Sequence, residues 1–217
     1  AVEKNDLISI SVAIHKLPEE FTTHKRIKKI YNDRSVSVLN GVGIDWATAE
    51  ALAFASLLSE GFGVRLSGQD VGRGTFSQRH AVLYDQVNEE RFVPLRHFQD
   101  QQGLFEIVDS FLSEYGVLGF EYGYSQVDPK TLVLWEGQFG DFANNAQTII
   151  DQFITTGERK WLRMSGLTLL LPHGHEGQGP EHTSGRVERF LQMCAEDNIH
   201  VFKCSSPGNY FHALIRV

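Results

Sequence analysis

The chain has 217 residues, of which 41% are hydrophobic, 22% charged and 11% aromatic, a composition that excludes collagen-like, low-complexity and disordered chains. Twenty Lys and Arg side chains against 27 Asp and Glu give a formal net charge of -7 at pH 7, so we expect no nucleic acid partner. At roughly 100–200 residues per domain, this length predicts one large domain or one domain with a short arm.

Cysteine content and hydropathy exclude further classes of protein. Cys194 and Cys204 are too few for a disulfide scaffold or a four-thiolate metal site, and they favour a reducing compartment. No apolar run approaches the roughly 18 residues that a membrane span needs, so we expect none. Residues 1–14 mix acidic and apolar side chains without the order of a signal or transit peptide, so any targeting segment is expected to have been removed.

The composition changes near residue 40. We interpret residues 1–40 as a preceding arm with a short amphipathic helix over 24–31, whose basic face is a solvated surface rather than an anion site. Residues 41–217 are expected to form the main domain. At its start, Asp45 is expected to cap a helix that Gly61 ends.

The rest of the chain alternates short apolar strands with helices. Strands are predicted at 64–66, 105–108, 131–135, 167–171 and 200–203, and helices open near Ser113 and contain Ala146 to Phe153, Val187 to Cys194 and Phe211 to Ile215. Strands that are apolar on both faces and alternate with helices indicate a parallel sheet covered on both sides. The predicted fold class is therefore α/β, an open, mostly parallel sheet with helices on both faces.

Three polar loops lie where such a sheet binds ligands, outside the carboxyl ends of its strands. They are residues 112–114, 136–145 and 172–184. The first places Glu114 at a helix start, where the helix dipole favours a carboxylate. The alternative is a glutamate that only caps the helix.

The second loop contains Gln138, Phe139 and Phe142. Recognition of a flat ring needs an aromatic face to stack on and an amide to meet a ring nitrogen or amino group. This mixture favours ring recognition, with two core phenylalanines as an equally weighted alternative.

The third loop carries three imidazoles, His173, His175 and His182. No helix holds them at a spacing typical of zinc ligands, so we expect no metal site. A catalytic imidazole is more plausible than zinc, and the alternative is a loop histidine bonded to the backbone.

Long sequence strings, in order, carry a family resemblance. They are RLSGQD at 65–70, RGTFSQRHA at 73–81, LSEYGVLGFEYG at 112–123, QFGDF at 138–142 and LPHGHEGQGPEH at 171–182. On these strings the chain from about Asp45 to Val217 closely resembles the transketolase-like pyrimidine-binding domain of thiamine-diphosphate-dependent 2-oxoacid dehydrogenases. Within that family it resembles the decarboxylating component of 2-oxoglutarate dehydrogenase. The glycine-rich loop from Ser67 to His80 is left without a role.

The resemblance implies roles for five residues. Glu114 hydrogen-bonds the pyrimidine ring nitrogen of thiamine diphosphate, which pushes the 4-amino group towards an imino form able to remove the thiazolium proton. Gln138 lies against the aminopyrimidine, Phe142 stacks on it, and Leu112 is an apolar neighbour that contributes backbone. His182 reaches the substrate or the covalent intermediate. Glu114 and His182 are thus the implied catalytic residues.

The resemblance also implies an activity and its partners. The activity is oxidative decarboxylation of 2-oxoglutarate with succinyl transfer to a lipoyl-bearing succinyltransferase. Mg²⁺ and the cofactor diphosphate are expected to bind a second domain, which this sequence lacks together with a carboxy-terminal domain, so the isolated chain is expected to be inactive. The full enzyme is expected to be a homodimer in the mitochondrial matrix, or in the cytoplasm of a bacterium.

Two alternatives to this function stay open at the level of the sequence. One is the same domain of a 2-oxoadipate dehydrogenase, because residues 69–74 suit either enzyme and the residues that measure the length of the oxoacid are expected in the second domain. The other is a non-catalytic interaction module of the same fold.

Overall fold

The structure, a computed structural model, describes residues 2–173, 175–179 and 182–217. Gly174, Pro180 and Glu181 of the third predicted loop lie outside the described residues. The chain forms two compact units. The first unit comprises residues 1–64, 72–106 and 204–217, and the second comprises residues 65–71 and 107–203.

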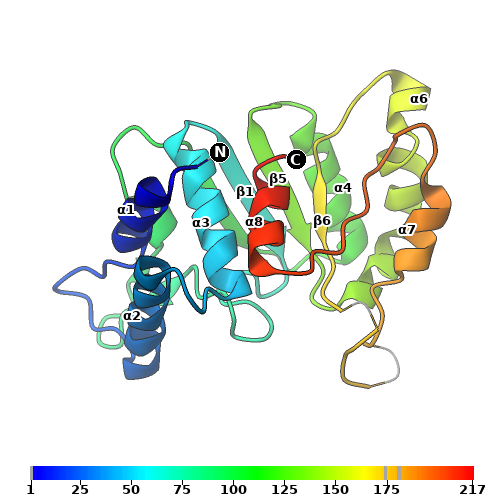
Figure 1. Cartoon of the computed structure of the whole chain (residues 1–217). Coiled ribbons are helices and arrows are strands. Elements are labelled where there is room, and N and C mark those ends of the chain that lie inside the picture. The colour runs from blue at the N-terminus through cyan, green and yellow to red at the C-terminus, as the bar shows by residue number, and fades with distance from the viewer. Residues whose placement is uncertain (1, 174, 180–181) are drawn as a thin grey trace. The chain divides into compact units, whose positions relative to one another are not determined.

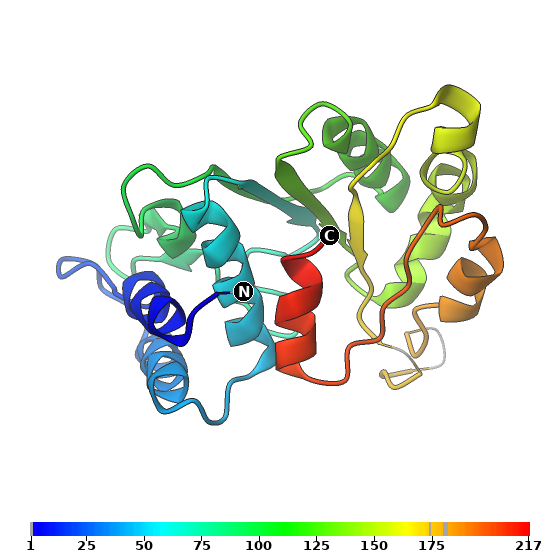
Figure 2. The same cartoon turned by 45° about the horizontal axis from the view of Figure 1, so that its top comes forward.

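The first unit is mainly helical. Its elements are α1 (Lys4–Ile14), α2 (Lys25–Asn40), α3 (Trp46–Ser59), η1 (Pro94–Arg96), α8 (Pro207–Leu214) and a small hairpin of β2 (Leu83–Tyr84) with β3 (Arg91–Phe92). Nine of the 14 residues of α3 are buried, and α8 lies alongside it (Figures 1 and 2). Helix α1 packs against both α2 and α3. The first unit is therefore organised around α3.

The predicted start of α3 is confirmed, and α2 is longer than the helix predicted there. Helix α2 confirms the amphipathic helix but runs on to Asn40, because only there does Gly41, at φ +69°, end it in the left-handed conformation. The Asp45 carboxylate caps α3 by accepting a hydrogen bond from the Thr48 N–H at 2.7 Å. Helix α1 was not predicted, and it begins without a side-chain cap that would have marked it in the sequence.

A polar network inside the first unit holds the second half of the glycine-rich loop. Arg79 pairs with the buried Glu50 carboxylate, which also accepts a hydrogen bond from the Tyr210 hydroxyl at 2.7 Å. Arg34 of α2 donates to the carbonyls of Gln78 and Arg79. This part of the loop is thereby tied to α2, α3 and α8.

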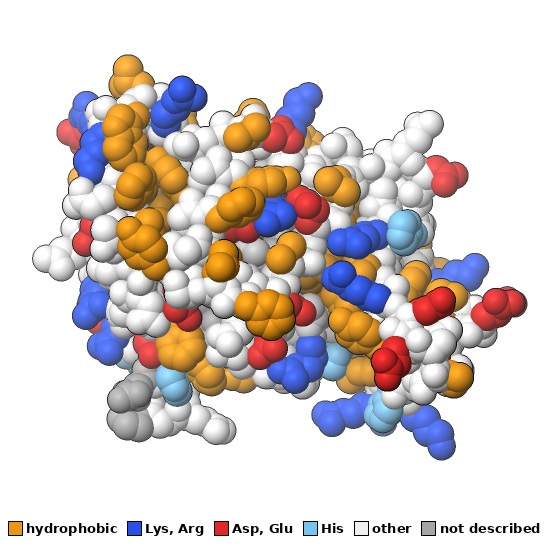
Figure 3. Space-filling view, turned by 180° about the vertical axis from the view of Figure 1, so that it is seen from behind, with side chains coloured by type: hydrophobic (Ala, Val, Ile, Leu, Met, Phe, Trp, Pro, Cys, Tyr) orange, Lys and Arg blue, Asp and Glu red, His pale blue; other side chains and the backbone are white. Residues whose placement is uncertain are grey.

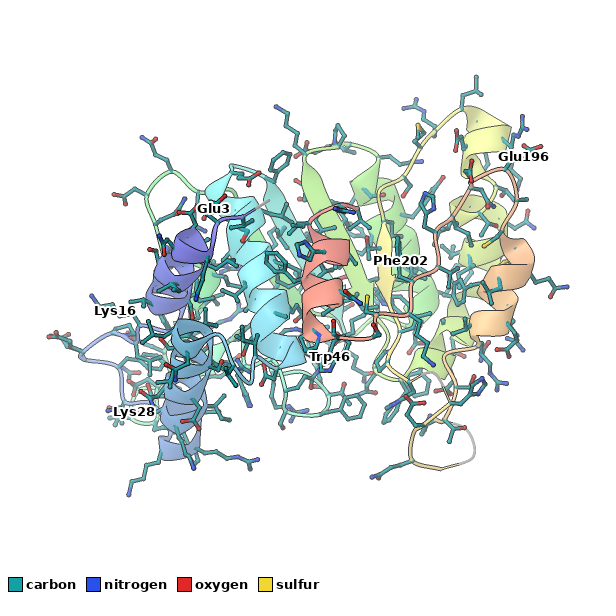
Figure 4. All side chains as sticks on the ribbon, viewed as in Figure 1. Glu3, Lys16, Lys28, Trp46, Glu196 and Phe202 are labelled. Atoms are coloured by element: carbon teal, nitrogen blue, oxygen red, sulfur yellow. The ribbon has the colours of Figure 1, made fainter. Side chains whose placement is uncertain are left out.

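Aromatic packing joins the same elements. The Trp46 ring at the start of α3 lies 5.8 Å from the Tyr210 ring of α8, and the position of Trp46 can be followed in Figure 4.

A four-stranded sheet supports the second unit. Its strand order is β4 (Phe105–Asp109), β1 (Gly63–Gly68), β5 (Thr131–Glu136), β6 (Thr168–Leu170). The pair β5 and β6 is parallel, with Leu134 opposite Thr168. All residues but the first are buried in the two inner strands β1 and β5, whereas the outer strands β4 and β6 are partly exposed. This mostly parallel sheet confirms the predicted α/β class.

Helical segments follow β4, β5 and β6 in the second unit, whereas β1 leads into the glycine-rich loop. They are α4 (Glu114–Ser125), η2 (Gly140–Ala146), α5 (Gln147–Ile149), the π-helical η3 (Ile150–Ile154), α6 (Gly157–Trp161) and α7 (Val187–Met193). Helix α4 packs against β5 and η2 (Figure 1). Their shared core is formed by Val117, Leu118, Trp135, Ala143, Ala146, Ile149 and Ile150. This packing brings the start of α4 and the loop after β5 into one region.

One predicted strand is wrong. Residues 200–203 are not in a strand, and all four are exposed; Phe202, labelled in Figure 4, keeps 63% of its surface. Apolar side chains alone do not make a strand when no neighbour supplies a hydrogen-bonding edge and a buried face. The α7 prediction is confirmed except for Cys194, which lies just beyond the helix. None of the described helices has the length and hydropathy to cross a membrane.

Candidate functional site

The site is built around η2, the seven-residue 3-10 helix that follows the carboxyl end of β5. A side chain at Gly140, its first residue, would meet the Pro172 carbonyl oxygen at 2.3 Å and the Gly185 Cα at 2.7 Å. Only glycine therefore allows the third polar loop to approach η2 this closely. Both ends of the third polar loop therefore pack against the start of η2. This is the edge of the sheet at which open α/β domains bind ligands.

Glu114, the first residue of α4, is held by η2. The Asn145 side-chain amide donates a hydrogen bond to Glu114 Oε2 at 3.1 Å. Among the described residues, Oε1 accepts no hydrogen bond. The preceding Ser113 makes no side-chain cap. A half-buried carboxylate with one open acceptor thus lies at the positive end of a helix.

Gln138, just before η2, is held from the other side. Its amide donates to Asp70 Oδ2 at 3.0 Å, and Asp70 follows β1 with a left-handed φ of +57°. The approach is tight here too, because a Cβ on Gly68 would meet the Glu136 carbonyl oxygen at 2.3 Å. With its N–H donating to Asp70, the amide of Gln138 offers its oxygen as an acceptor.

His182 is surrounded by three side chains from this turn. Its Nδ1 lies 3.2 Å and 3.3 Å from the two carboxylate oxygens of Asp141. The Phe139 ring stacks on the imidazole at a centroid distance of 4.3 Å and an angle of 21°. The Phe142 ring meets it edge-on at 5.2 Å and 87°. The imidazole is therefore held at Nδ1 by Asp141 and packed by the rings of Phe139 and Phe142.

The structure brings four of the five residues of the sequence-based site to η2. Phe142 lies on η2, Gln138 lies just before it, and Glu114 and His182 have partners on it. Leu112 is not part of this set of contacts. It is 63% exposed, and its backbone N–H donates to the Ser110 hydroxyl at 3.2 Å.

Sequence reasoning missed the partners that orient these side chains, namely Asp70, Asp141 and Asn145. All three lie within the polar strings and loops that the sequence singled out, but nothing in them marks which residue each contacts. Of the two other loop histidines, His173 stacks on Phe139 at 5.8 Å. The described part of the chain contains no group of three or more His, Cys, Asp or Glu side chains placed to hold a metal ion.

Fold and site together define an α/β domain with a half-open polar and aromatic site beyond the carboxyl end of a central strand. The sequence profile of the family described as "Transketolase, pyrimidine binding domain" matches residues 42–217. The chain therefore belongs to the family of transketolase pyrimidine-binding domains, which confirms the resemblance.

Curated relatives narrow the comparison. Over 216 residues the chain is 58% identical to the 2-oxoglutarate dehydrogenase E1 components of Brucella anthropi, Brucella ovis and Brucella canis. The match covers 100% of this chain but 22% of each relative, so the chain spans about a fifth of their length.

Proposed function

We propose that this chain is the pyrimidine-binding part of the decarboxylating component of a 2-oxoglutarate dehydrogenase. Identity of 58% to three proteins of that name and the family match support the proposal. The observation that carries it is the Glu114 carboxylate at the start of α4, held through one oxygen by Asn145 and open at the other among the described residues.

The side chains fit the aminopyrimidine of thiamine diphosphate. Glu114 Oε1 is an open acceptor for a protonated ring nitrogen, and the Gln138 amide oxygen is an acceptor for the exocyclic amino group. Phe142 adds a half-buried ring for stacking. Two acceptors and one aromatic face match the polar edge and the flat face of an aminopyrimidine.

The proposed division of labour follows from these positions. Bound thiamine diphosphate supplies a carbon nucleophile and an electron sink for decarboxylation of the 2-oxoacid. Glu114 holds a proton at the ring nitrogen, Gln138 orients the amino group, and Phe142 fixes the plane of the ring. His182 faces the substrate, and Leu112 contributes an apolar wall.

Substrate and partners are also proposals. We place Mg²⁺ and the cofactor diphosphate on another part of the full-length enzyme, which acts as a homodimer and passes the succinyl group to a lipoyl-bearing succinyltransferase. Exposed hydrophobic side chains around the start of α4, such as Phe111 and Tyr115, support a covering partner, and Figure 3 shows hydrophobic side chains gathered at several places on one face. Because the named relatives are bacterial, we propose the bacterial cytoplasm rather than the mitochondrial matrix.

A chimeric enzyme tests this function. The matching segment of the Brucella anthropi protein is replaced by this chain, and reduction of an artificial electron acceptor is followed with thiamine diphosphate, Mg²⁺ and either 2-oxoglutarate or 2-oxoadipate. We expect 2-oxoglutarate-dependent activity within about tenfold of the parent enzyme. A preference for 2-oxoadipate would transfer the proposal to the oxoadipate enzymes, and a folded but inactive chimera would favour a non-catalytic module.

Glu114→Gln in the same chimera tests the role of the carboxylate. It should lower kcat by about 100-fold, which corresponds to about 2.7 kcal/mol of barrier. The control Glu158→Gln changes an exposed glutamate of α6 and should leave kcat unchanged. Unchanged activity of Glu114→Gln would contradict the assignment.

A further inference from the structure

Asp141 has a single partner in the described structure. Its side chain is 12% exposed, and its only contact of hydrogen-bond length is with His182. A carboxylate removed from water to this degree needs a hydrogen-bond donor. The pair with His182 therefore accounts for the position of Asp141 in the first turn of η2.

The pair also determines where the proton of His182 lies. An ionised carboxylate only accepts hydrogen bonds, so the imidazole must donate through Nδ1. In the neutral ring this leaves Nε2 as the acceptor, and the described residues give Nε2 no partner. Asp141 thereby selects one of the two tautomers.

Two aromatic rings also restrict the orientation of the imidazole. Phe139 stacks on one face of the imidazole, and the Phe142 ring packs against it nearly at a right angle. Phe142 is also the ring proposed to stack on the aminopyrimidine. The imidazole in the third polar loop and the proposed stacking ring in η2 are therefore in contact.

We propose that Asp141 is a positioning residue that holds His182 as the Nδ1–H tautomer and presents Nε2 to the 2-oxoacid. This inference rests on the proposed function of the site. As Nε2 takes a proton, the Asp141 carboxylate stabilises the imidazolium, as carboxylates do in other histidine pairs. His182 can then accept and return one proton at a defined atom.

The tautomer can be measured without any activity. In the 217-residue chain labelled with ¹⁵N-histidine, the nitrogen shifts and ring-proton couplings of His182 are recorded at about pH 9, where ordinary imidazoles are neutral, and are assigned by their loss in His182→Gln. We expect a protonated Nδ1 and an unprotonated Nε2. Asp141→Asn should move the proton towards Nε2, Asp141→Glu should retain the native tautomer, and the control Asp151→Asn should have no effect. An Nε2–H tautomer in the unmodified chain, or no change in Asp141→Asn, would overturn the proposal.

Kinetics in the chimera test the consequence for catalysis. Asp141→Asn should lower kcat at least about tenfold with less than a threefold change in the KM for 2-oxoglutarate, and Asp141→Glu should recover part of the loss. A changed tautomer with unchanged kcat would refute the positioning role. If the chimera with native Asp141 were inactive, the proposed function would fail. The tautomer measurement would still show whether Asp141 holds His182 as the Nδ1–H tautomer.

Discussion

Helix α4 carries two glutamates that differ in burial and in the hydrogen bonds that their carboxylates accept. Glu121, in its second half, is 1% exposed and receives two hydrogen bonds from Arg65, at 2.8 Å and 2.9 Å. The Arg65 guanidinium also lies 4.6 Å from the centroid of the Tyr124 ring. Glu114, in the first turn, has the neutral Asn145 as its only partner among the described residues and keeps one oxygen open.

This difference separates carboxylates that hold the fold from those that can hold a ligand. Both oxygens of Glu121 are used inside the protein, so it has nothing to offer a ligand. Glu114 is oriented but not saturated. The open acceptor at the helix start, rather than burial or charge, therefore distinguishes Glu114 from Glu121 as the candidate ligand-binding carboxylate.

Removing the charge of Glu121 should have the largest effect on stability. Glu121→Gln removes the negative charge that accepts two hydrogen bonds from the buried Arg65 guanidinium, and we expect a loss of about 3–5 kcal/mol in the free energy of unfolding, measured by urea denaturation. The double variant Arg65→Met/Glu121→Leu should lose less than the single variant, because it removes the buried positive charge together with the negative one. A loss below about 1 kcal/mol for Glu121→Gln would show that the charge of Glu121 does not hold the fold.

His15, in the first unit, is a partly buried titratable side chain that, unlike Glu114 and Glu121, is kept uncharged by the fold. Burial lowers its pKa to about 4, an effect strengthened by the charge of Arg34 and opposed by the hydrogen bond from Nδ1 to the Ser11 carbonyl. Between pH 6.5 and 4 the unfolded state therefore binds more protons than the folded state, and stability falls as the pH falls.

The loss over this range should reach about 3 kcal/mol. His15→Gln removes the titrating group, so its unfolding free energy should depend less on pH between pH 7 and pH 4. Parallel pH curves for the two proteins would show that His15 is not kept neutral by the fold.

The helix caps provide a smaller and cleaner contrast. Asp45 caps α3 through a hydrogen bond to the Thr48 N–H, so Asp45→Ala should cost about 1 kcal/mol. Ser113 precedes α4 without making such a bond, and Ser113→Ala should change the unfolding free energy by less than about 0.5 kcal/mol. Equal losses in thermal or urea unfolding would mean that the start of α4 is as fully capped as that of α3.

Glu114→Gln should have the smallest effect on stability. The Asn145 hydrogen bond has a neutral counterpart in glutamine, and the side chain is only half buried, so we expect a change within about 0.5 kcal/mol. The same substitution is expected to abolish most activity in the chimera. A large loss of stability would show that Glu114 holds the fold, as Glu121 does.

Much of the fold could be predicted because its signals are local. The Asp45 cap, the left-handed Gly61 and the buried apolar run of β5 each depend on a few neighbouring residues. Residues 200–203 show the limit of such local prediction. Their apolar pattern predicted a strand, but in the structure they are exposed and form none. Whether such a segment pairs depends on a neighbouring strand, which no local pattern describes.

By itself, the sequence determined the α/β class, the order of most helices and strands, and the residues Glu114, Gln138, Phe142 and His182 as the candidate site. Only the tertiary structure decided how they are oriented. Asn145 is 31 residues from Glu114, Asp141 is 41 from His182, and Asp70 is 68 from Gln138. Such pairings arise when η2 packs against α4 and the loops close over glycines with no room for a side chain, and hydrogen-bond partners this far apart have no periodicity in the chain to reveal them.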